Sequence, residues 1–164
     1  MGLIPDDLWE NLAASPLAAS IRASIWIYPF LETAHVIGLA LVVGSIVSFD
    51  LRVLGLNRDL SVRRLSRHLL PWVWTGFFIN ASTGVLLFVS DAAEFAANRA
   101  LQVKLLLILA AGLNAALFQG RLIRSVETWD TRERAPAGAR ASAALSITLW
   151  LAIVVAGRTI AYIE

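Results

Sequence analysis

One histidine inside an apolar segment is the residue best suited to chemistry in this sequence. His35 lies in the mainly apolar run that begins at residue 25. A neutral imidazole can ligate haem iron or a divalent metal ion, and it can carry protons near neutral pH. The alternative is a buried imidazole that only hydrogen-bonds to a neighbouring helix. Because ionisable groups are costly inside a membrane, we take His35 as the first candidate for a cofactor or metal ligand.

Other polar residues interrupt this run and the three remaining apolar segments. Glu32 precedes His35 by three residues and therefore shares its helix face. The second segment contains Asn80 and Thr83, and the third contains Lys104. Successive segments run in opposite directions, so residues far apart in the sequence fall at similar depths. We therefore predict one polar layer in the outer half of a helical bundle, formed by Glu32, His35, Asn80, Thr83, Lys104, Arg158 and Thr159.

The charged residues near the segment ends each have two interpretations. Lys104 and Arg158 could extend toward lipid headgroups. In the functional interpretation Lys104 pairs with Glu32, and Arg158 holds an anionic group such as a haem propionate or a substrate carboxylate. Glu32 could instead complement the dipole at the start of its helix. Asp50 and Arg52 are typical of a pair that ends a membrane span, with an ion pair between helices as the alternative.

Small residues accompany these polar groups. Gly38 is one turn from His35, and Gly76, Asn80 and Gly84 form a stripe at intervals of four residues. A slot beside the imidazole would admit a flat ligand such as haem. Small residues also let transmembrane helices pack closely without any ligand. The histidine one turn away makes the ligand slot as strong an interpretation as close packing.

A second histidine constrains how haem could bind. His68 belongs to a basic stretch at the inner interface and is expected to contact solvent or lipid headgroups. His35 lies about 20 Å from that end of its helix at 1.5 Å per residue. Two axial ligands of one haem would lie only about 4 Å apart, given metal–imidazole bonds of about 2 Å. One chain therefore cannot hold a haem between these histidines, so any haem is five-coordinate, shared between subunits, or completed by Lys104 or water.

Composition excludes several classes of protein and site. The chain has 164 residues, 58% apolar and 16% charged, whereas about a quarter of a soluble domain is charged. Cysteine is absent and Met1 is the single methionine, which excludes thiolate zinc sites, iron–sulfur clusters and Cys/Met copper sites within this chain. The basic residues lie in two loops rather than on one face, so no nucleic acid is expected as a partner.

Four apolar runs are each long enough to cross a bilayer, which takes about 20 helical residues. They cover residues 25–49, 69–90, 100–120 and 141–163. Their Leu- and Ala-rich composition, without alternation, favours helices over strands. We therefore predict an all-α fold: a single membrane domain over residues 1–164, built as a four-helix transmembrane bundle in contact with membrane lipids.

The distribution of basic residues predicts the orientation of the bundle. Ten of the 14 Lys and Arg residues fall in the loops that follow the first and third runs. By the positive-inside rule these loops lie inside, and both termini lie outside.

Residues 1–24 are predicted to lie at the outer surface. Residues 6–12 are typical of a short amphipathic helix, with Trp9 among the headgroups. Ser15 and Pro16 suit the start of a second short helix, and Pro29 suits the first turn of the first span. The acidic residues and the long following run argue against a cleaved signal peptide.

Several short motifs resemble those of small bacterial four-helix membrane proteins. His35-Val-Ile-Gly38, Asp50-Leu-Arg52-Val-Leu-Gly55 and Gln102-Val-Lys104-Leu are similar to segments of CopD-type copper-resistance membrane domains and HemJ-type protoporphyrinogen oxidases. Leu70-Pro71-Trp72 and Gly157-Arg158-Thr-Ile-Ala161-Tyr162 resemble more closely an uncharacterised family of the same size.

The resemblance implies a bacterial inner-membrane protein with a first-helix histidine as haem or metal ligand, carried onto His35. It also implies a third-helix lysine near the site, carried onto Lys104. The spacing from His35 to Arg52 and the absence of a tryptophan midway along the first helix depart from the oxidase pattern. The absence of cysteine and internal methionine weakens a copper-transport function.

Three functional hypotheses follow. The first is a b-type haem protein with His35 as ligand, which exchanges electrons or hydrogen with a quinone or porphyrin-like ligand. In it Asn80 and Thr83 line the pocket, and Lys104 and Arg158 bind anionic groups. The second is a small-molecule or ion transporter that works as an oligomer. The third is a non-catalytic subunit of a larger membrane complex, without a cofactor. We expect the chain to form a homo-oligomer or to be a subunit of a complex, and whether it is an enzyme stays open.

Overall fold

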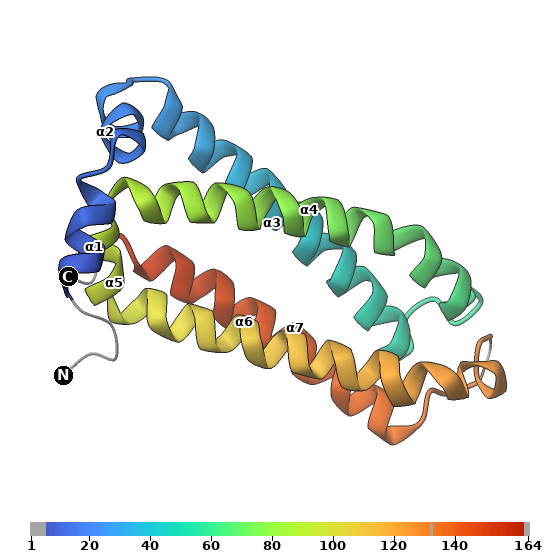
Figure 1. Cartoon of the computed structure of the whole chain (residues 1–164). Coiled ribbons are helices and arrows are strands. Elements are labelled where there is room, and N and C mark those ends of the chain that lie inside the picture. The colour runs from blue at the N-terminus through green and yellow to red at the C-terminus, as the bar shows by residue number, and fades with distance from the viewer. Residues whose placement is uncertain (1–5, 132, 163–164) are drawn as a thin grey trace.

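The computed structural model describes residues 6–131 and 133–162, and within them all regular structure is helical. Four helices are long and apolar enough to cross a membrane: α3 (Ile27–Leu54), α4 (Val62–Ser90), α6 (Arg99–Leu117) and α7 (Ala137–Thr159). They lie side by side as two antiparallel pairs (Figure 1). The predicted all-α fold with four long apolar helices is confirmed.

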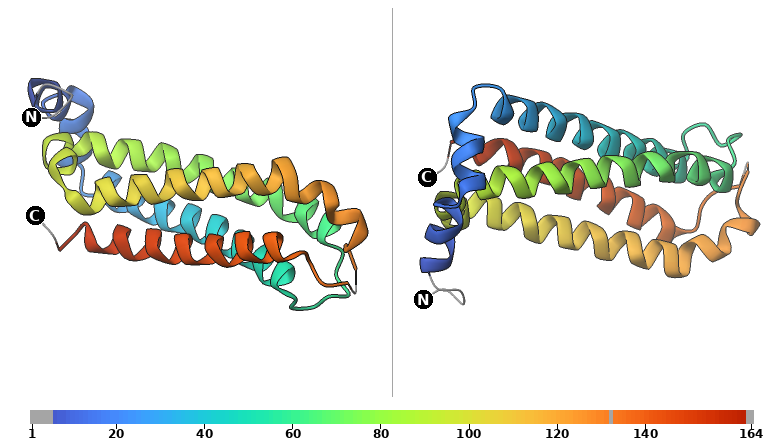
Figure 2. Two further views of the ribbon diagram at one scale, coloured as in Figure 1. Left: turned by 90° about the horizontal axis from the view of Figure 1, so that it is seen from below. Right: turned by 45° about the horizontal axis from the view of Figure 1, so that its top comes forward.

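The two ends of the bundle differ in what covers them. Three short helices, α1 (Asp6–Ala13), α2 (Pro16–Ala23) and α5 (Ala92–Ala97), gather at the end we call the α5 end (Figure 2). The opposite end, the loop end, holds the turn after α3 and the connection between α6 and α7. That connection contains two short helices, η1 (Phe118–Leu122) and η2 (Ile123–Thr128).

The four long helices are not all in contact with one another. α3 packs against both α4 and α7, and α6 packs against α7, whereas no comparable contact joins α4 to α6. Within the part of the chain that the structure describes, the α3–α4 pair and the α6–α7 pair are therefore joined mainly along α3 and α7.

Capping side chains explain where several helices begin. The Ser15 side chain accepts a hydrogen bond from the backbone N–H of Ala18 at 3.2 Å, and Pro16 occupies the first turn, as predicted. Ser61 and Asn98 cap α4 and α6 in the same way. The local sequence is thus sufficient to start these helices.

α4 begins earlier than the apolar run that predicts it. The helix starts at Val62 rather than at residue 69, and it includes the exposed residues Arg63, Arg64 and Arg67. Arginine is a good helix former, and its charged end reaches water from a helix surface. The apolar run therefore marks the part of the helix that fits hydrocarbon, not the whole helix.

Arg22 fastens the N-terminal helices to the end of α4. Its guanidinium donates hydrogen bonds to the carbonyl oxygens of Ser90 and of Ala13, the latter at 2.9 Å. Trp9 of α1 also packs edge-on against Phe88 of α4, with ring centroids 5.5 Å apart. The short helices are therefore attached to the bundle rather than separate from it.

Arg52 organises the loop end. It is 2% exposed and donates hydrogen bonds to the carbonyl oxygens of Leu60 at 2.6 Å, Arg58 at 3.0 Å and Asp130 at 2.9 Å. The Asp130 carboxylate in turn accepts hydrogen bonds from the Ser61 hydroxyl at 2.8 Å and from the Arg63 backbone N–H at 3.0 Å. This network holds the turn after α3 against the segment that follows η2.

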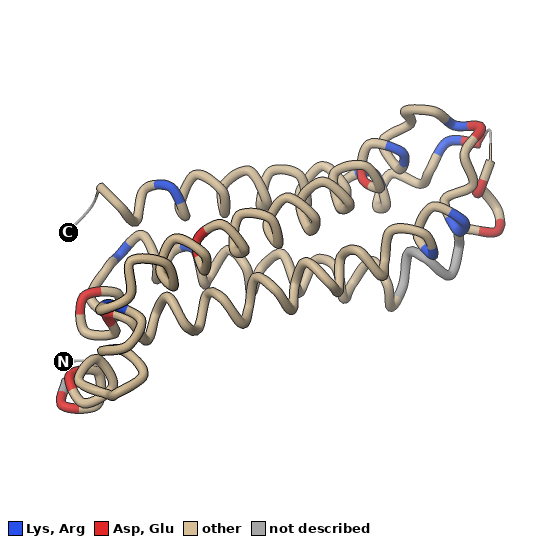
Figure 3. The backbone as a smooth tube through the Cα atoms, turned by 90° about the horizontal axis from the view of Figure 1, so that it is seen from above, with Lys and Arg blue, Asp and Glu red and all other residues tan. Residues whose placement is uncertain are grey.

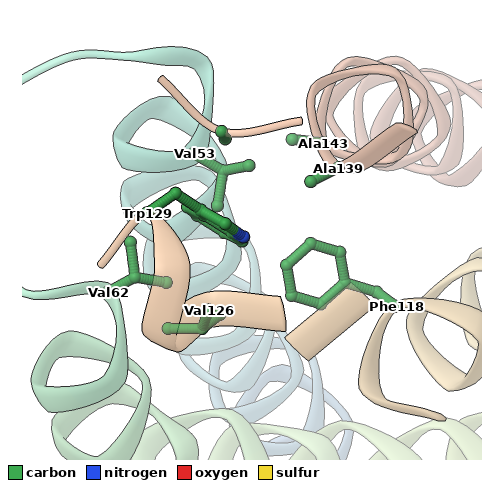
Figure 4. Packing of buried hydrophobic residues seen from close by; sticks show 8 residues of the cluster. Val53, Val62, Phe118, Val126, Trp129, Ala139 and Ala143 are labelled. Carbon is green, nitrogen blue, oxygen red and sulfur yellow. The ribbon is translucent and has the colours of Figure 1, made fainter. Parts of the chain in front are cut away.

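The largest buried apolar cluster also lies at the loop end. Trp129 and Phe118 lie among small aliphatic side chains (Figure 4), and Phe49 packs edge-on against Phe118 with centroids 5.5 Å apart. The cluster consists of Val53, Val62, Phe118, Val126, Trp129, Ala135, Ala139 and Ala143.

Charged residues are concentrated toward the two ends of the bundle (Figure 3).

Candidate functional site

The imidazole of His35 is held by a hydroxyl on the neighbouring helix. Its Nδ1 atom lies 3.0 Å from the Thr83 hydroxyl oxygen. That hydroxyl donates its single hydrogen to a backbone carbonyl, most closely that of Ile79 at 2.6 Å, so toward His35 it acts as an acceptor. With the hydroxyl as acceptor, neutral His35 carries its hydrogen on Nδ1. This assignment leaves Nε2 with a free lone pair, the form of histidine that binds metals.

Two more residues of α4 fix the position of His35. The Asn80 side-chain amide donates a hydrogen bond to the His35 carbonyl oxygen at 2.7 Å. Gly84 leaves room for the ring, because a Cβ atom there would lie 3.2 Å from Cε1 of the imidazole. α4 therefore supports both the backbone and the ring of His35, and a larger residue at position 84 would press on the ring.

Gly38 lets α3 and α4 cross at close range and does not form a slot for a ligand. A Cβ atom at Gly38 would lie 3.0 Å from both the Asn80 backbone nitrogen and the Gly76 carbonyl oxygen. A Cβ atom at Gly76 would lie 2.7 Å from the Gly38 carbonyl oxygen. The backbones meet where both residues lack a side chain, and the space beside Gly38 is already filled by α4. For this pair, close helix packing accounts for the small residues.

Lys104 provides a positive charge near His35. Its side chain is half-buried and passes close to Gly157 of α7, where a Cβ atom would lie 3.5 Å from the lysine Nζ. Nζ makes no hydrogen bond or salt bridge with any residue that the structure describes. It is close enough to His35 to interact with it electrostatically. An unpaired ammonium in an apolar bundle can accommodate an anionic ligand group.

The other predicted members of the polar layer lie apart from this group. Glu32 is exposed and forms no salt bridge with Lys104. Arg158 donates a hydrogen bond to the Tyr162 hydroxyl at 2.7 Å and lies 5.1 Å from the centre of that ring. Thr159 donates back to a carbonyl of its own helix at 2.8 Å. The structure thus brings together His35, Asn80, Thr83 and Lys104, with Gly38 at the adjoining helix crossing.

The possible metal ligands in the site favour haem over a bare metal ion. Within residues 6–131 and 133–162, no three His, Asp or Glu side chains are grouped so as to hold a metal ion. A bare ion needs several protein ligands, whereas a porphyrin supplies four nitrogens to its iron and needs one axial histidine. A lone His35 with a free Nε2 therefore fits haem better than it fits an isolated divalent ion.

A second polar group lies nearer the loop end and is not among the predicted site residues. The Asn114 side-chain amide donates to the Ser142 carbonyl oxygen at 3.0 Å, and the Ser142 hydroxyl donates to Asn114 Oδ1 at 2.9 Å. One turn further along α7, Ser146 lies near the carboxyl group of Asp50. Asp50 is buried rather than solvated, and no salt bridge joins it to Arg52. The asparagine inside the third apolar run is the signal that could have indicated this group.

No protein-family model, no curated protein and no solved structure matches this chain. The resemblance to CopD-type and HemJ-type membrane proteins therefore stays a prediction.

Proposed function

We propose that this chain is a multi-pass protein of the bacterial inner membrane that binds b-type haem, or a similarly flat ligand, through His35. The observation that carries the proposal is the hydrogen bond between His35 Nδ1 and the Thr83 hydroxyl. It leaves Nε2 unprotonated, and it is the kind of outer hydrogen bond that orients metal-bound histidines. When bound, haem supplies reversible one-electron chemistry at its iron.

Lys104 has the second role in this proposal. A haem carries propionates, and quinone or porphyrin-like partners carry carbonyl or carboxylate oxygens that a nearby ammonium can bind. Lys104 is half-buried and unpaired among the described residues, and it lies within electrostatic range of His35. Its charge would favour an anionic edge on the ligand and would fix the ligand's orientation relative to the imidazole.

The proposed orientation places this site in the outer half of the membrane. His35 is about 12 Å from the start of α3, at 1.5 Å per residue. With both termini outside, by the positive-inside distribution of arginines, the α5 end faces outward and the loop end faces the cytoplasm. A membrane-dissolved quinone or porphyrin-like compound would then reach His35 from the outer leaflet.

Absorption spectroscopy tests the proposal directly. The detergent-purified protein, supplied with haem, should show a Soret band and reduced α and β bands, and His35→Ala should lose them. His68→Ala is the matched control, because that histidine is exposed near the loop end of α4 and should leave the spectrum unchanged. A featureless spectrum from folded, haem-supplied protein would rule out haem binding, and a transport site or a subunit contact would then account for the polar group.

A further inference from the structure

Asp50 is a buried carboxyl group that lacks a compensating charge. It lies on α3 close to the loop end, is 5% exposed, and its Oδ2 atom has no hydrogen-bond partner. Buried side-chain oxygens and nitrogens are otherwise paired throughout the part of the chain that the structure describes. An orphaned oxygen on an acidic side chain therefore needs an explanation.

The described residues place no cationic side chain beside Asp50. On α7, the Ser146 hydroxyl lies near the carboxyl group, and no charged side chain among the described residues acts on it. Arg52, two residues further along α3, directs its guanidinium to three backbone carbonyls of the loop end. Ser142, one turn from Ser146, is engaged with Asn114 through both its hydroxyl and its carbonyl oxygen.

Apolar packing separates Asp50 from the nearest aqueous end. Val53, one turn further along α3, is 1% exposed and belongs to the buried cluster at the loop end. Phe49, the preceding residue, packs edge-on against Phe118. An ionised carboxylate in this position would be shielded from water and would have no counter-charge among the described residues, which is far less favourable than a neutral carboxylic acid with one unpaired atom.

We propose that Asp50 and Ser146 form a proton-binding site between α3 and α7, with the proton on the Asp50 carboxyl group at neutral pH. A metal cation would need more oxygen ligands than one carboxyl and one hydroxyl, since hard cations take about six or more. The site is about 22 Å from His35 along α3, at 1.5 Å per residue, so the proposal is independent of haem binding.

The position of the site gives the proton a structural consequence. α3 and α7 form the main contact between the two helix pairs, and Asp50 lies in that contact. Loss of the proton would place an uncompensated negative charge between the pairs. Ionisation of Asp50 should therefore loosen the α3–α7 contact and admit water to it.

Infrared spectroscopy of the full chain in lipid nanodiscs tests this proposal. At neutral pH we expect a carbonyl stretching band of a protonated carboxylic acid, which shifts in D₂O and is lost in Asp50→Asn. Asp59→Asn is the matched control, because Asp59 is exposed in the turn after α3 and should leave the band unchanged. Ser146→Ala should keep the band but shift its frequency, since the acid loses its nearest polar neighbour.

Protein labelled with ¹³C at the aspartate carboxyl carbons gives the same information without any substitution. A protonated band with the isotope shift supports the proposal even if Asp50→Asn does not fold. If every aspartate shows carboxylate bands at neutral pH, the proposal is overturned. Carboxylate bands that change with added Na⁺ or K⁺ would also overturn it, in favour of a cation site.

Discussion

The Nδ1 atom of His35 on α3 lies 3.0 Å from the hydroxyl oxygen of Thr83 on α4. The same hydroxyl donates to the carbonyl of Ile79 at 2.6 Å, one turn earlier in its own helix. Because the Thr83 hydroxyl donates to its own helix backbone, it can only accept from His35, and it thereby selects the tautomer of that histidine. The chemistry available at Nε2 depends on a residue that need not touch the ligand.

Removing this hydroxyl should weaken ligand binding without removing the ligating atom. In Thr83→Val, His35 loses the acceptor for its Nδ1 hydrogen, and the ring is free to change tautomer and orientation. We expect haem affinity to fall by about 10- to 100-fold, as for other outer-shell substitutions at metal sites. Titration of the purified protein with haem, followed at the Soret band, measures the change.

Ser82→Ala is the control for Thr83→Val. Ser82 is the adjacent residue of α4, is exposed, and bonds only within its own helix, at 2.7 Å to the Phe78 carbonyl. Its removal should leave haem affinity unchanged. Equal affinities for wild type and Thr83→Val would contradict the role of the hydroxyl.

Adding one methyl group at the helix crossing should destabilise the bundle. In Gly38→Ala the new Cβ would meet backbone atoms of Asn80 and Gly76 at 3.0 Å, so the two helices must move apart. We expect the free energy of unfolding to fall by about 1–3 kcal/mol, the usual effect of overpacking. Unfolding of the detergent-solubilised protein, followed by circular dichroism, provides the measurement.

Gly44→Ala provides the matched comparison on the same helix. A Cβ atom there has no neighbour within 4 Å. Alanine also has the higher helix propensity, so the free energy of unfolding should stay the same or rise by up to about 1 kcal/mol. A similar loss of stability in both variants would argue against the close crossing at Gly38.

Replacing Lys104 should affect stability and ligand binding in opposite directions. Its ammonium is half-buried and unpaired among the described residues, so Lys104→Met should raise the free energy of unfolding of the ligand-free protein. We expect about 1 kcal/mol, less than the roughly 3 kcal/mol for a lysine at mid-membrane, because Lys104 is near a helix end. The affinity for an anionic porphyrin should fall at the same time.

Comparison of ligands separates a charge effect from a packing effect at Lys104. An uncharged porphyrin ester should bind wild type and Lys104→Met with similar affinity, whereas the diacid should prefer wild type. Arg99→Gln, an exposed position at the start of α6, should change neither affinity. An equal loss of affinity for ester and diacid would mean that Lys104 does not bind an anionic group.

The loop end should lose stability in acid because of Asp130. Burial acts to raise the pKa of Asp130, but hydrogen bonds from Arg63, Ser61 and Val62 and the nearby charge of Arg52 outweigh it and lower this pKa below its ordinary value of 3.8. A lowered folded-state pKa stabilises the protein at pH values above 3.8. This stabilisation is lost as pH falls from 3.8 through the lower folded-state pKa.

Hydrogen exchange of the Arg63 amide should report this loss, because this amide bonds to Oδ1 of the Asp130 carboxylate. Its protection should fall across that acidic range in wild type. In Asp130→Ala its protection should be low already at neutral pH and should change little in acid. An acid-independent protection in wild type would contradict the expected titration.

The elements of the fold follow from local sequence more directly than the contacts between them. Ser15 and Pro16 specify the start of α2 through atoms within three residues, so the sequence suffices to place it. Apolar runs likewise predict the four long helices, although the apolar criterion misses the charged first turns of α4. Neither pattern specifies how a helix is rotated about its axis.

Helix rotation explains why the predicted polar layer is only partly assembled. Glu32 and His35 are close in sequence, yet Glu32 is exposed while His35 faces Thr83. Arg158 lies near the α5 end of α7, and its side chain turns to Tyr162. The depth of a residue within the bundle follows from its position along a span. The neighbours of its side chain depend instead on which helices pack together. The burial of Asp50 against α7 escapes sequence reasoning for the same reason.

The hydrogen bonds of Arg22 also constrain the order in which the protein can assemble during synthesis. Its guanidinium bonds to the carbonyl oxygens of Ala13 and Ser90, and the second of these is 68 residues further along the chain. When α1 and α2 leave the ribosome, the end of α4 has not yet been made. The N-terminal helices can therefore form this contact only after α3 and α4 have been synthesised and inserted into the bilayer.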